Sequence, residues 1–253
     1  DMAHVDKFKK HIDYLLPDEE QRVYFMDWLA AKVQDPYFRG TGIVMVAESF
    51  GVGRTTLGNM LSELFGLQNS VNVAFDNLLN PNEYNHWEDK QLIVVSEAKE
   101  TAAISESRGA YRAYEALKQR VDTTVTETTL NIKFQPHRRV KVVSSYLILT
   151  NHTNAVAVPA NDRRLTILRN PDMPAPQAYF NALNQWIGER DEHRRPVWAK
   201  HIWRWLSNYE VSDYDALMHP LHTESKTQMT EQGLHGPGKV IKELASLAAN
   251  SGM

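Results

Sequence analysis

The sequence contains no cysteine, no long apolar run and very little net charge. Because cysteine is absent, the chain has no disulfide, no thiolate metal site and no cysteine nucleophile. No apolar stretch reaches the roughly 18 residues of a membrane-spanning helix, and no signal-peptide pattern is present, so we predict no membrane partner. The formal net charge is −3, so contact with nucleic acid would have to come from a local basic patch.

Length and composition are those of a globular protein with a sizeable core. The chain has 253 residues, of which 42% are hydrophobic and 23% are charged. This size corresponds to one large domain with at most a small satellite. We expect a helical N-terminal unit over residues 1–40, a core over 41–175 and a helical C-terminal region over 176–253.

The N-terminal unit is predicted to contain two helices. The first covers roughly residues 4–15, and the second covers 18–34, where the acidic residues after Pro17 suit a helix N-terminus. Five apolar residues of the second helix fall on one helical stripe: Val23, Met26, Leu29, Ala30 and Val33. We therefore interpret residues 18–34 as an amphipathic helix.

Short apolar runs without polar alternation recur along the core. The predicted strands cover residues 43–47, 71–75, 91–97, 140–150 and 164–168. Strands that are covered by helices on both faces have this composition, as in a parallel sheet. Since helical segments alternate with the strands, we predict an α/β fold of three layers with a parallel central sheet. The Thr-rich segment 122–134 and the basic turn after it predict a β-hairpin that leads into the strand of 140–150.

A glycine turn follows the first predicted strand and leads into a helix. Phosphate-binding loops read G-x-x-x-x-G-K-[ST], whereas here Glu48 replaces the first glycine and Arg54 replaces the lysine. The remaining glycines can still direct backbone N–H groups at phosphate oxygens, and Thr55 can place its hydroxyl on Mg²⁺. The candidate nucleotide-binding residues are Gly51, Val52, Gly53, Arg54, Thr55 and Thr56. The alternative is a strand–turn–helix that needs glycine only for steric reasons.

Polar residues next to three predicted strands are candidates for nucleotide hydrolysis. Glu97 ends an apolar strand, so it could activate the attacking water and help to hold Mg²⁺. Asn151 follows another strand, which we expect beside the loop strand, so it could contact the γ-phosphate. Arg163 and Arg164 open the last strand, where an arginine can stabilise charge on the phosphate that transfers in a neighbouring subunit. Each of these residues also has a structural interpretation, as a turn or surface residue.

Basic residues concentrate at the turn of the predicted hairpin. Between positions 133 and 141 the sequence contains Lys133, His137, Arg138, Arg139 and Lys141. Around a turn at Pro136 these groups could project together and neutralise the phosphates of single-stranded DNA, while Phe134 could stack on a base. A solvated charged turn is the alternative.

Tryptophan and histidine are interpreted as structural residues. Trp198, Ile202 and Trp205 fall at helical spacing, which indicates core packing rather than a stacking platform. The mixed-charge run 189–195 is interpreted as a solvated loop. The histidines show no metal-ligand spacing, and we interpret four of them as ordinary residues: His11, His86, His201 and His219.

A set of short segments, taken in their order along the chain, resembles the superfamily 3 helicases. The resemblance is closer to the helicase-like domain at the C-terminal end of phage and plasmid primase–helicase proteins. The resemblance covers about residues 10–226. The matching segments are 28-WLAAKVQDP-36, 51-GVGRTTL-57, 92-LIVVSE-97, 131-NIKF-134, 149-LTNH-152, 161-NDRR-164 and 219-HPLHTESK-226. Two residues depart from the family pattern: Ser96 stands where an acid is common, and Glu48 stands where the loop usually has glycine.

The resemblance implies an AAA+-like P-loop core that assembles into a ring, with a homo-hexamer expected. It implies that ATP and Mg²⁺ bind between subunits and that single-stranded DNA occupies the central pore. The implied roles are a phosphate loop at residues 51–56, a catalytic glutamate at Glu97, a sensor at Asn151, an arginine finger at Arg163 or, slightly preferred, Arg164, and a DNA-facing hairpin at residues 131–141.

The leading hypothesis is a DNA-dependent ATPase motor, a helicase or translocase module of a phage or plasmid replication protein. The resemblance implies an upstream primase or polymerase domain and, for a phage protein, the cytoplasm of a bacterial host. Two alternatives stay open. One is a nucleotide-binding ring or scaffold with weak or lost hydrolysis. The other is a small-molecule P-loop kinase, which would need an acceptor site and an arginine-bearing lid.

Overall fold

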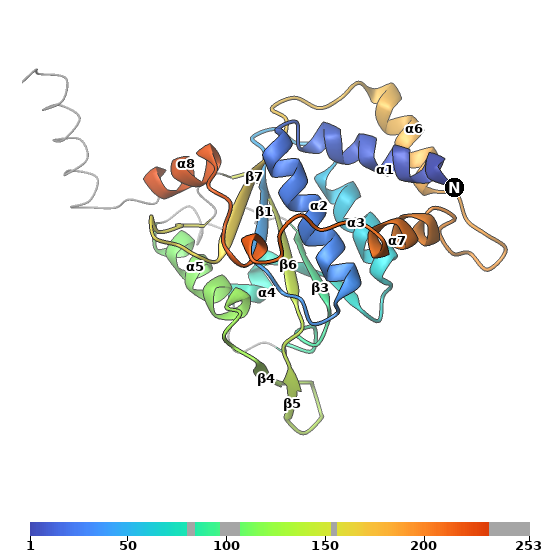
Figure 1. The fold of residues 1–253 in the computed structure, drawn as a ribbon. Coiled ribbons are helices and arrows are strands. Elements are labelled where there is room, and N and C mark those ends of the chain that lie inside the picture. The colour runs from blue at the N-terminus through green and yellow to red at the C-terminus, as the bar shows by residue number, and fades with distance from the viewer. Residues whose placement is uncertain (80–83, 97–106, 153–155, 233–253) are drawn as a thin grey trace, which may run out of the picture.

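Five parallel strands form the centre of the molecule (Figure 1). The computed structural model describes residues 1–79, 84–96, 107–152 and 156–232. Within these residues the strand order of the sheet is β2-β3-β6-β1-β7. The strands are β1 (Gly42–Val46), β2 (Ser70–Ala74), β3 (Leu92–Ser96), β6 (Ser145–Thr150) and β7 (Leu165–Arg169). The predicted parallel sheet is confirmed.

Both faces of this sheet are buried, which explains why its strands show no polar alternation in the sequence. In β1, Ile43 and Met45 pack into one hydrophobic cluster, whereas Val44 packs into the other. Neighbouring strands keep this register, since Ile43 pairs with Leu147 of β6 and both belong to the first cluster. Alternate side chains of a strand point to opposite faces, so a strand between two helical layers is apolar throughout.

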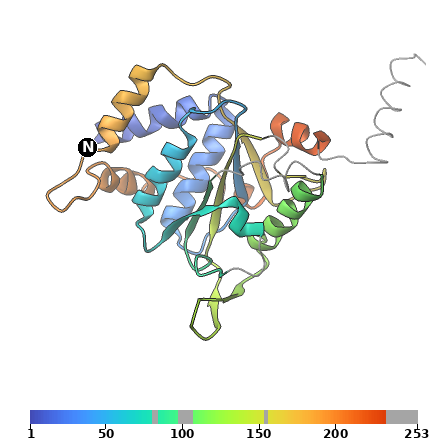
Figure 2. The same cartoon turned by 180° about the vertical axis from the view of Figure 1, so that it is seen from behind.

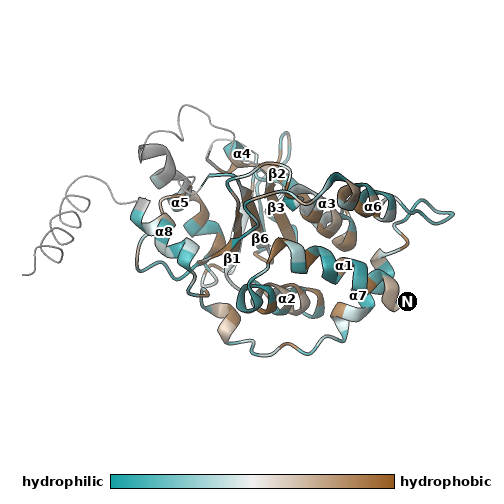
Figure 3. Cartoon of the chain, turned by 90° about the horizontal axis from the view of Figure 1, so that it is seen from above, coloured by the Kyte–Doolittle hydropathy of each residue, from teal (hydrophilic) through white to brown (hydrophobic). Residues whose placement is uncertain are grey.

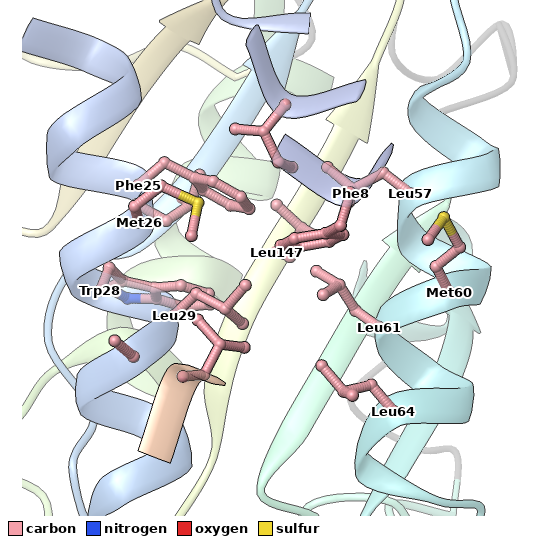
Figure 4. Packing of buried hydrophobic residues seen from close by; sticks show 14 of the residues in the cluster. Phe8, Phe25, Met26, Trp28, Leu29, Leu57, Met60, Leu61, Leu64 and Leu147 are labelled. Atoms are coloured by element: carbon pink, nitrogen blue, oxygen red, sulfur yellow. The ribbon is translucent and has the colours of Figure 1, made fainter. Parts of the chain in front are cut away.

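One face of the sheet carries helices from both the beginning and the later part of the chain (Figure 3). These helices are α1 (Met2–Leu15), α2 (Glu19–Gln34), α3 (Arg54–Phe65), α6 (Gln177–Ile187) and α7 (Ala199–Ser207). Phe8, Phe25 and Leu61 meet Leu147 of the sheet in one cluster (Figure 4). The predicted core residue Trp198 is also buried there, so segments far apart in the sequence share one core.

In the part of the chain that the structure describes, the opposite face is covered by α4 (Phe75–Leu79), α5 (Ser107–Val121) and α8 (Glu224–Gln232). Leu117 of α5 and Met229 of α8 are fully buried against the sheet. A 3-10 turn, Ala216–Met218, precedes α8. The predicted three layers are therefore present. The last part of the predicted helical C-terminal region, residues 233–253, lies outside the described residues. Within the described residues no helix has the length and hydropathy to cross a membrane.

Helix α2 is buried on more sides than its sequence predicts. Met26 and Leu29 are buried as expected, but Val23 is 41% exposed, so the predicted stripe is wrong at that position. Asp27 and Lys32 lie off the stripe and are buried. The reason is that α2 packs on the sheet and also against α7 and the 3-10 turn, which leaves little of its surface to water.

A two-stranded antiparallel hairpin, β4 (Glu127–Leu130) and β5 (Arg138–Lys141), projects from the body of the molecule (Figure 2). The predicted hairpin is confirmed, and it leads into β6. It therefore lies at the edge where the parallel strands begin, opposite to the edge where β1 ends. Buried Lys32 anchors its base, because Nζ donates hydrogen bonds to the carbonyl oxygens of Phe38 (2.7 Å) and Val143.

Candidate functional site

The loop between β1 and α3 has the backbone of an anion-binding turn. Gly51 and Gly53 have positive φ angles of 76° and 96°, which residues with a side chain rarely adopt. Gly53 is the N-cap of α3, and a glycine has no side chain with which to cap this helix end. The first N–H groups of α3 lie at the end of the helix where its dipole favours negative charge.

A cavity of about 170 Å³ opens at this loop. It is lined by Phe50, Gly51, Val52, Gly53, Arg54, Thr55, Thr56, Leu149, Asn151 and Phe180. All of the predicted nucleotide-binding residues therefore border one hollow, together with the predicted sensor Asn151. Thr55 is exposed and Thr56 is half-buried. The turn is thus open to a ligand rather than filled by its own side chains.

Arg54 lies at the ends of two neighbouring strands and is only 6% exposed. Its guanidinium donates hydrogen bonds to the carbonyl oxygen of Thr150 and to Oδ1 of Asn151, both at the end of β6. It also donates to the carbonyl oxygen of Met45 in β1 (3.4 Å). A planar guanidinium can serve several acceptors at once. The fold thus joins the predicted cation to the predicted sensor, 97 positions apart in the sequence.

Glu48, which replaces the first glycine of the loop pattern, is bound outside the cavity. Its carboxylate forms an ion pair with Arg169 (3.3 Å), and Arg169 also pairs with Asp172 (2.6 Å). The Glu48 side chain is 68% exposed and does not line the hollow. The glutamate at this loop position therefore does not place an uncompensated negative charge in the cavity.

His11 contacts the loop directly, although we interpreted it from the sequence as an ordinary residue. It is fully buried, with Nε2 3.3 Å from the carbonyl oxygen of Gly53 and Nδ1 2.9 Å from the hydroxyl of Tyr179. Burial lowers the pKa of His11 to about 4, so the ring is neutral near neutral pH. Because a carbonyl can only accept, Nε2–H donates to Gly53 and Nδ1 accepts from Tyr179. No sequence spacing connects position 11 with the loop.

His11 should make the stability of the fold sensitive to acid. The unfolded histidine takes up a proton near its ordinary pKa of 6.5, whereas the folded one does so only near 4. The contribution of His11 to the free energy of unfolding is therefore fully present above pH 6.5. It falls by about 3 kcal/mol as the pH drops from 6.5 to about 4.

Denaturant titrations from neutral pH down to pH 4 measure this contribution. We expect the stability of His11→Gln to decline less steeply with acid than that of the wild type. His219→Gln changes an exposed histidine and should follow the wild type. Parallel curves for all three proteins would refute the assignment of a neutral His11.

The two loop glycines differ in the room around them. A Cβ atom at Gly53 would lie 2.9 Å from Cε1 of His11 and 3.2 Å from Phe180, whereas one at Gly51 would meet no atom of the described residues within 4 Å. Alanine in a left-handed conformation costs about 1–2 kcal/mol, and overpacking adds to this cost. We expect Gly53→Ala to destabilise the fold by about 2–4 kcal/mol and Gly51→Ala by the backbone cost alone, measured by chemical unfolding. Equal losses would mean that the His11 contact is unimportant.

Arg163 and Arg164 lie at the edge of the sheet opposite to the cavity. The N–H of Gly42, where β1 begins, donates to the carbonyl oxygen of Arg164 (2.9 Å), whereas the cavity lies where β1 ends. The length of the strand separates these edges by roughly 16 Å. Arg164 forms an ion pair with Asp122 (2.6 Å). Arg163 is exposed, and its side chain has no ion pair or hydrogen bond within the described residues.

A buried polar cluster holds the turn that carries these arginines. Asp162 accepts hydrogen bonds from the hydroxyl of Tyr114 (3.0 Å) and from the N–H of Leu165 (2.9 Å). It also forms an ion pair with Nζ of Lys226 (2.9 Å), and neither of these two side chains is more than 10% exposed. Residues of α5, β7 and α8 thus meet beside Arg163.

The predicted catalytic glutamate, Glu97, lies outside the described residues. Ser96, the last residue of β3, is half-buried, and β3 pairs with β6, the strand before Asn151. No group of three His, Asp or Glu side chains in the described ranges could hold a metal ion. Of the two predicted Mg²⁺ ligands, the structure therefore places one, Thr55, at the cavity.

The predicted DNA-binding residues are exposed around the tip of the hairpin, far from the cavity. They are Lys133, His137, Arg138 and Arg139. Arg138 and Arg139 make long ion pairs, of 3.7 Å with Asp89 and 3.8 Å with Glu127. Phe134 is 94% exposed, with a positive φ of 61°. The tip thus presents basic groups and an aromatic ring to solvent.

Comparison with known protein families finds one match. The family described as "Family of unknown function (DUF5906)" matches residues 45–164, a range that contains the glycine loop, the hairpin and the arginine turn. No curated protein matches the sequence.

The fold is similar to solved structures of the NrS-1 C-terminal region. The apo structure of residues 305–718 has a TM-score of 0.73 at 19% identity, over 94% of this chain and 53% of that one. An A form apo structure has a TM-score of 0.69 at 18% identity, over 91% and 52%. The chain therefore spans about half the length of these structures, and it is similar in fold to that part of the NrS-1 C-terminal region.

Proposed function

We propose that this chain is an ATP-dependent DNA helicase or translocase module of a phage or plasmid replication protein, which forms a ring and hydrolyses ATP between subunits. The observation that carries the proposal is the open cavity at the β1–α3 loop. There two positive-φ glycines and the N-terminus of α3, whose N-cap is a glycine, meet a buried arginine. Backbone N–H groups at a helix N-terminus form a ready phosphate site.

Arg54 takes the place of the lysine that usually contacts the phosphates. Its guanidinium is bound to Thr150 and Asn151 at the end of β6, and it has five N–H groups to share between protein and ligand. In this proposal Asn151 orients Arg54 and contacts the terminal phosphate. The hydroxyl of Thr55 opens onto the same cavity and would bind Mg²⁺, which would neutralise phosphate charge. Glu97 keeps its proposed role in activating water and holding the metal.

The distance between the cavity and the arginine turn supports a site shared between subunits. Because Arg163 and Arg164 lie at the other edge of the sheet, only a neighbouring copy could bring them to the phosphates. An arginine there would stabilise charge on the transferring phosphoryl group. We favour Arg163, since Arg164 is held by Asp122 in its own chain. Head-to-tail contacts of this kind close into a ring when the rotation between neighbouring copies closes, and a homo-hexamer is the expected assembly.

Steady-state ATP hydrolysis, measured with and without single-stranded DNA, tests the function. Turnover that DNA stimulates is the expected result. Tight nucleotide binding without turnover would favour the scaffold alternative, for which Ser96 in place of an acid is the motivating feature. DNA-independent phosphate transfer to a metabolite would favour a kinase. Particle mass with and without nucleotide would test the ring.

The hairpin is proposed to contact the phosphates of single-stranded DNA. Arg138→Ala with Arg139→Ala should weaken DNA binding and reduce the slope of log affinity against log salt by about 1.4, since each phosphate contact contributes about 0.7. Both side chains are exposed, so the fold should be unaffected. The matched control is Arg194→Ala with Arg195→Ala, an adjacent exposed pair in another loop. Equal slopes for both double variants would exclude the hairpin as the DNA contact.

The described chain spans about half of the NrS-1 structures that it matches. We propose that the complete protein carries a primase or polymerase domain upstream and works in the cytoplasm of a bacterial host. Mass analysis of the natural full-length product, together with a primer-synthesis assay, would test this organisation.

A further inference from the structure

Two phenylalanine rings border the cavity, and phosphate binding explains neither. Phe50 belongs to the loop and is 69% exposed, whereas Phe180 comes from α6 and is half-buried. Both line the hollow, together with Leu149. Charged phosphate oxygens gain no hydrogen bonds from such groups. The apolar part of the lining therefore indicates a second, uncharged portion of the ligand.

Phe180 is held in place by an aromatic cluster that reaches back to His11. The ring of Tyr179 lies 5.3 Å from that of Phe180 at 81°, and the ring of Tyr14 lies 6.3 Å from it at 80°. Tyr179 is itself hydrogen-bonded to His11. Edge-to-face contacts of this kind are favourable and orient the ring. Since Phe180 also lies 3.2 Å from the Cβ position of Gly53, an oriented aromatic ring stands directly beside the loop.

The polar residues of the lining all belong to the phosphate end of the site. Arg54, Thr55 and Thr56 form the first turn of α3, and Asn151 follows β6. The described lining therefore offers ring surfaces to a base but no separate set of donors and acceptors for the base edge. Stacking on aromatic rings tolerates different bases, because every base has a π face.

We propose that Phe50 and Phe180 bind the nucleobase by stacking, and that the site accepts nucleoside triphosphates with little discrimination between purine bases. This inference rests on the proposed nucleotide-binding function. The loop would hold the phosphates, and the two rings would hold the base. ATP would then be selected because it is abundant, and not because the site recognises the hydrogen-bonding edge of adenine.

Calorimetric titration of the chain in the presence of Mg²⁺ with ATPγS, GTPγS and inorganic tripolyphosphate tests the proposal. The two nucleotides should bind within about threefold of each other, and both about tenfold more tightly than tripolyphosphate. Phe50→Ala and Phe180→Ala should each weaken nucleotide binding by about tenfold and leave tripolyphosphate binding unchanged. Phe180→Trp keeps an aromatic ring at this position and should therefore bind nucleotide with about the affinity of the wild type.

The controls separate the base site from the phosphate site. Because Phe50 is exposed, Phe50→Ala tests the proposal even if Phe180→Ala disturbs the aromatic cluster. Tyr111→Ala removes another exposed aromatic ring and should bind all three ligands as the wild type does. If the phenylalanine variants lost nucleotide and tripolyphosphate affinity equally, the base site would be overturned. If the wild type bound ATPγS more than about 30-fold more tightly than GTPγS, the inference that the site accepts different bases would be overturned. If the wild-type chain bound tripolyphosphate as tightly as nucleotide, the base site would be overturned but the proposed function would not. If it bound neither ligand, the proposed function would be overturned as well.

Discussion

Arg163→Ala is expected to slow ATP turnover by at least about 10³-fold while ATP binding is retained, as for other arginines that stabilise a transferring phosphoryl group. The residue is exposed at the edge of the sheet opposite to its own cavity, so its substitution should not disturb the fold. The measurement is DNA-stimulated hydrolysis at saturating ATP, with nucleotide affinity determined separately.

Mixing the variant with wild-type chain distinguishes action on a neighbour from action within one chain. If Arg163 completes the adjacent site, activity should fall more steeply than the fraction of wild-type subunits. Arg204→Ala, at an exposed arginine of α7, is the matched control and should leave turnover unchanged. A proportional decline on mixing would contradict a shared site.

Arg164→Ala provides the comparison within the same turn. It removes the ion pair with Asp122, so we expect a loss of stability as its main effect. If Arg164→Ala instead abolished turnover without destabilising the chain, and Arg163→Ala were silent, the finger would be Arg164.

Lys226→Met is expected to lower the free energy of unfolding by about 3–5 kcal/mol, as is usual when one partner of a buried ion pair is removed. Nζ of Lys226 donates to the carboxylate of Asp162 (2.9 Å) and to the carbonyl oxygens of Asp162 (2.8 Å) and Leu165 (2.9 Å). The substitution leaves the buried carboxylate of Asp162 without its charged partner. Denaturant unfolding measures the loss.

Lys118→Met is the matched control for this prediction. Lys118 pairs with Glu115 on α5 at 3.2 Å, and both side chains are more than a third exposed. Exposed pairs of this kind contribute at most about 1 kcal/mol. Similar losses for the two variants would mean that the Asp162–Lys226 pair is not an important support of the arginine turn.

The elements of the sheet and the hairpin were predictable because their signals are local. Apolar runs such as 43–47 and 91–97 mark strands that helices cover on both faces, and β1 and β3 lie within one residue of them. The glycine pair and the basic turn likewise belong to short stretches whose backbone and charge follow from composition. The stripe of α2 failed at Val23, since the periodicity of one helix does not reveal how many neighbours pack on it.

The residues that pack around the glycine loop were not predictable in this way. His11 and the Gly53 carbonyl are 42 positions apart, and His11 and Tyr179 are 168 positions apart. Phe180 carries no motif and reaches the loop only because α6 packs beside α1 and α3 on one face of the sheet.

By itself, the amino-acid sequence determined the strand–helix alternation, the glycine turn and the basic hairpin, because each depends on neighbours within a few positions. Only the tertiary structure decided that Arg54 meets Asn151, that aromatic rings border the cavity at the glycine loop, and that the arginine turn lies at the other edge of the sheet. Those relations depend on the order β2-β3-β6-β1-β7. Strand order arises from the packing of distant segments, and no local periodicity records it.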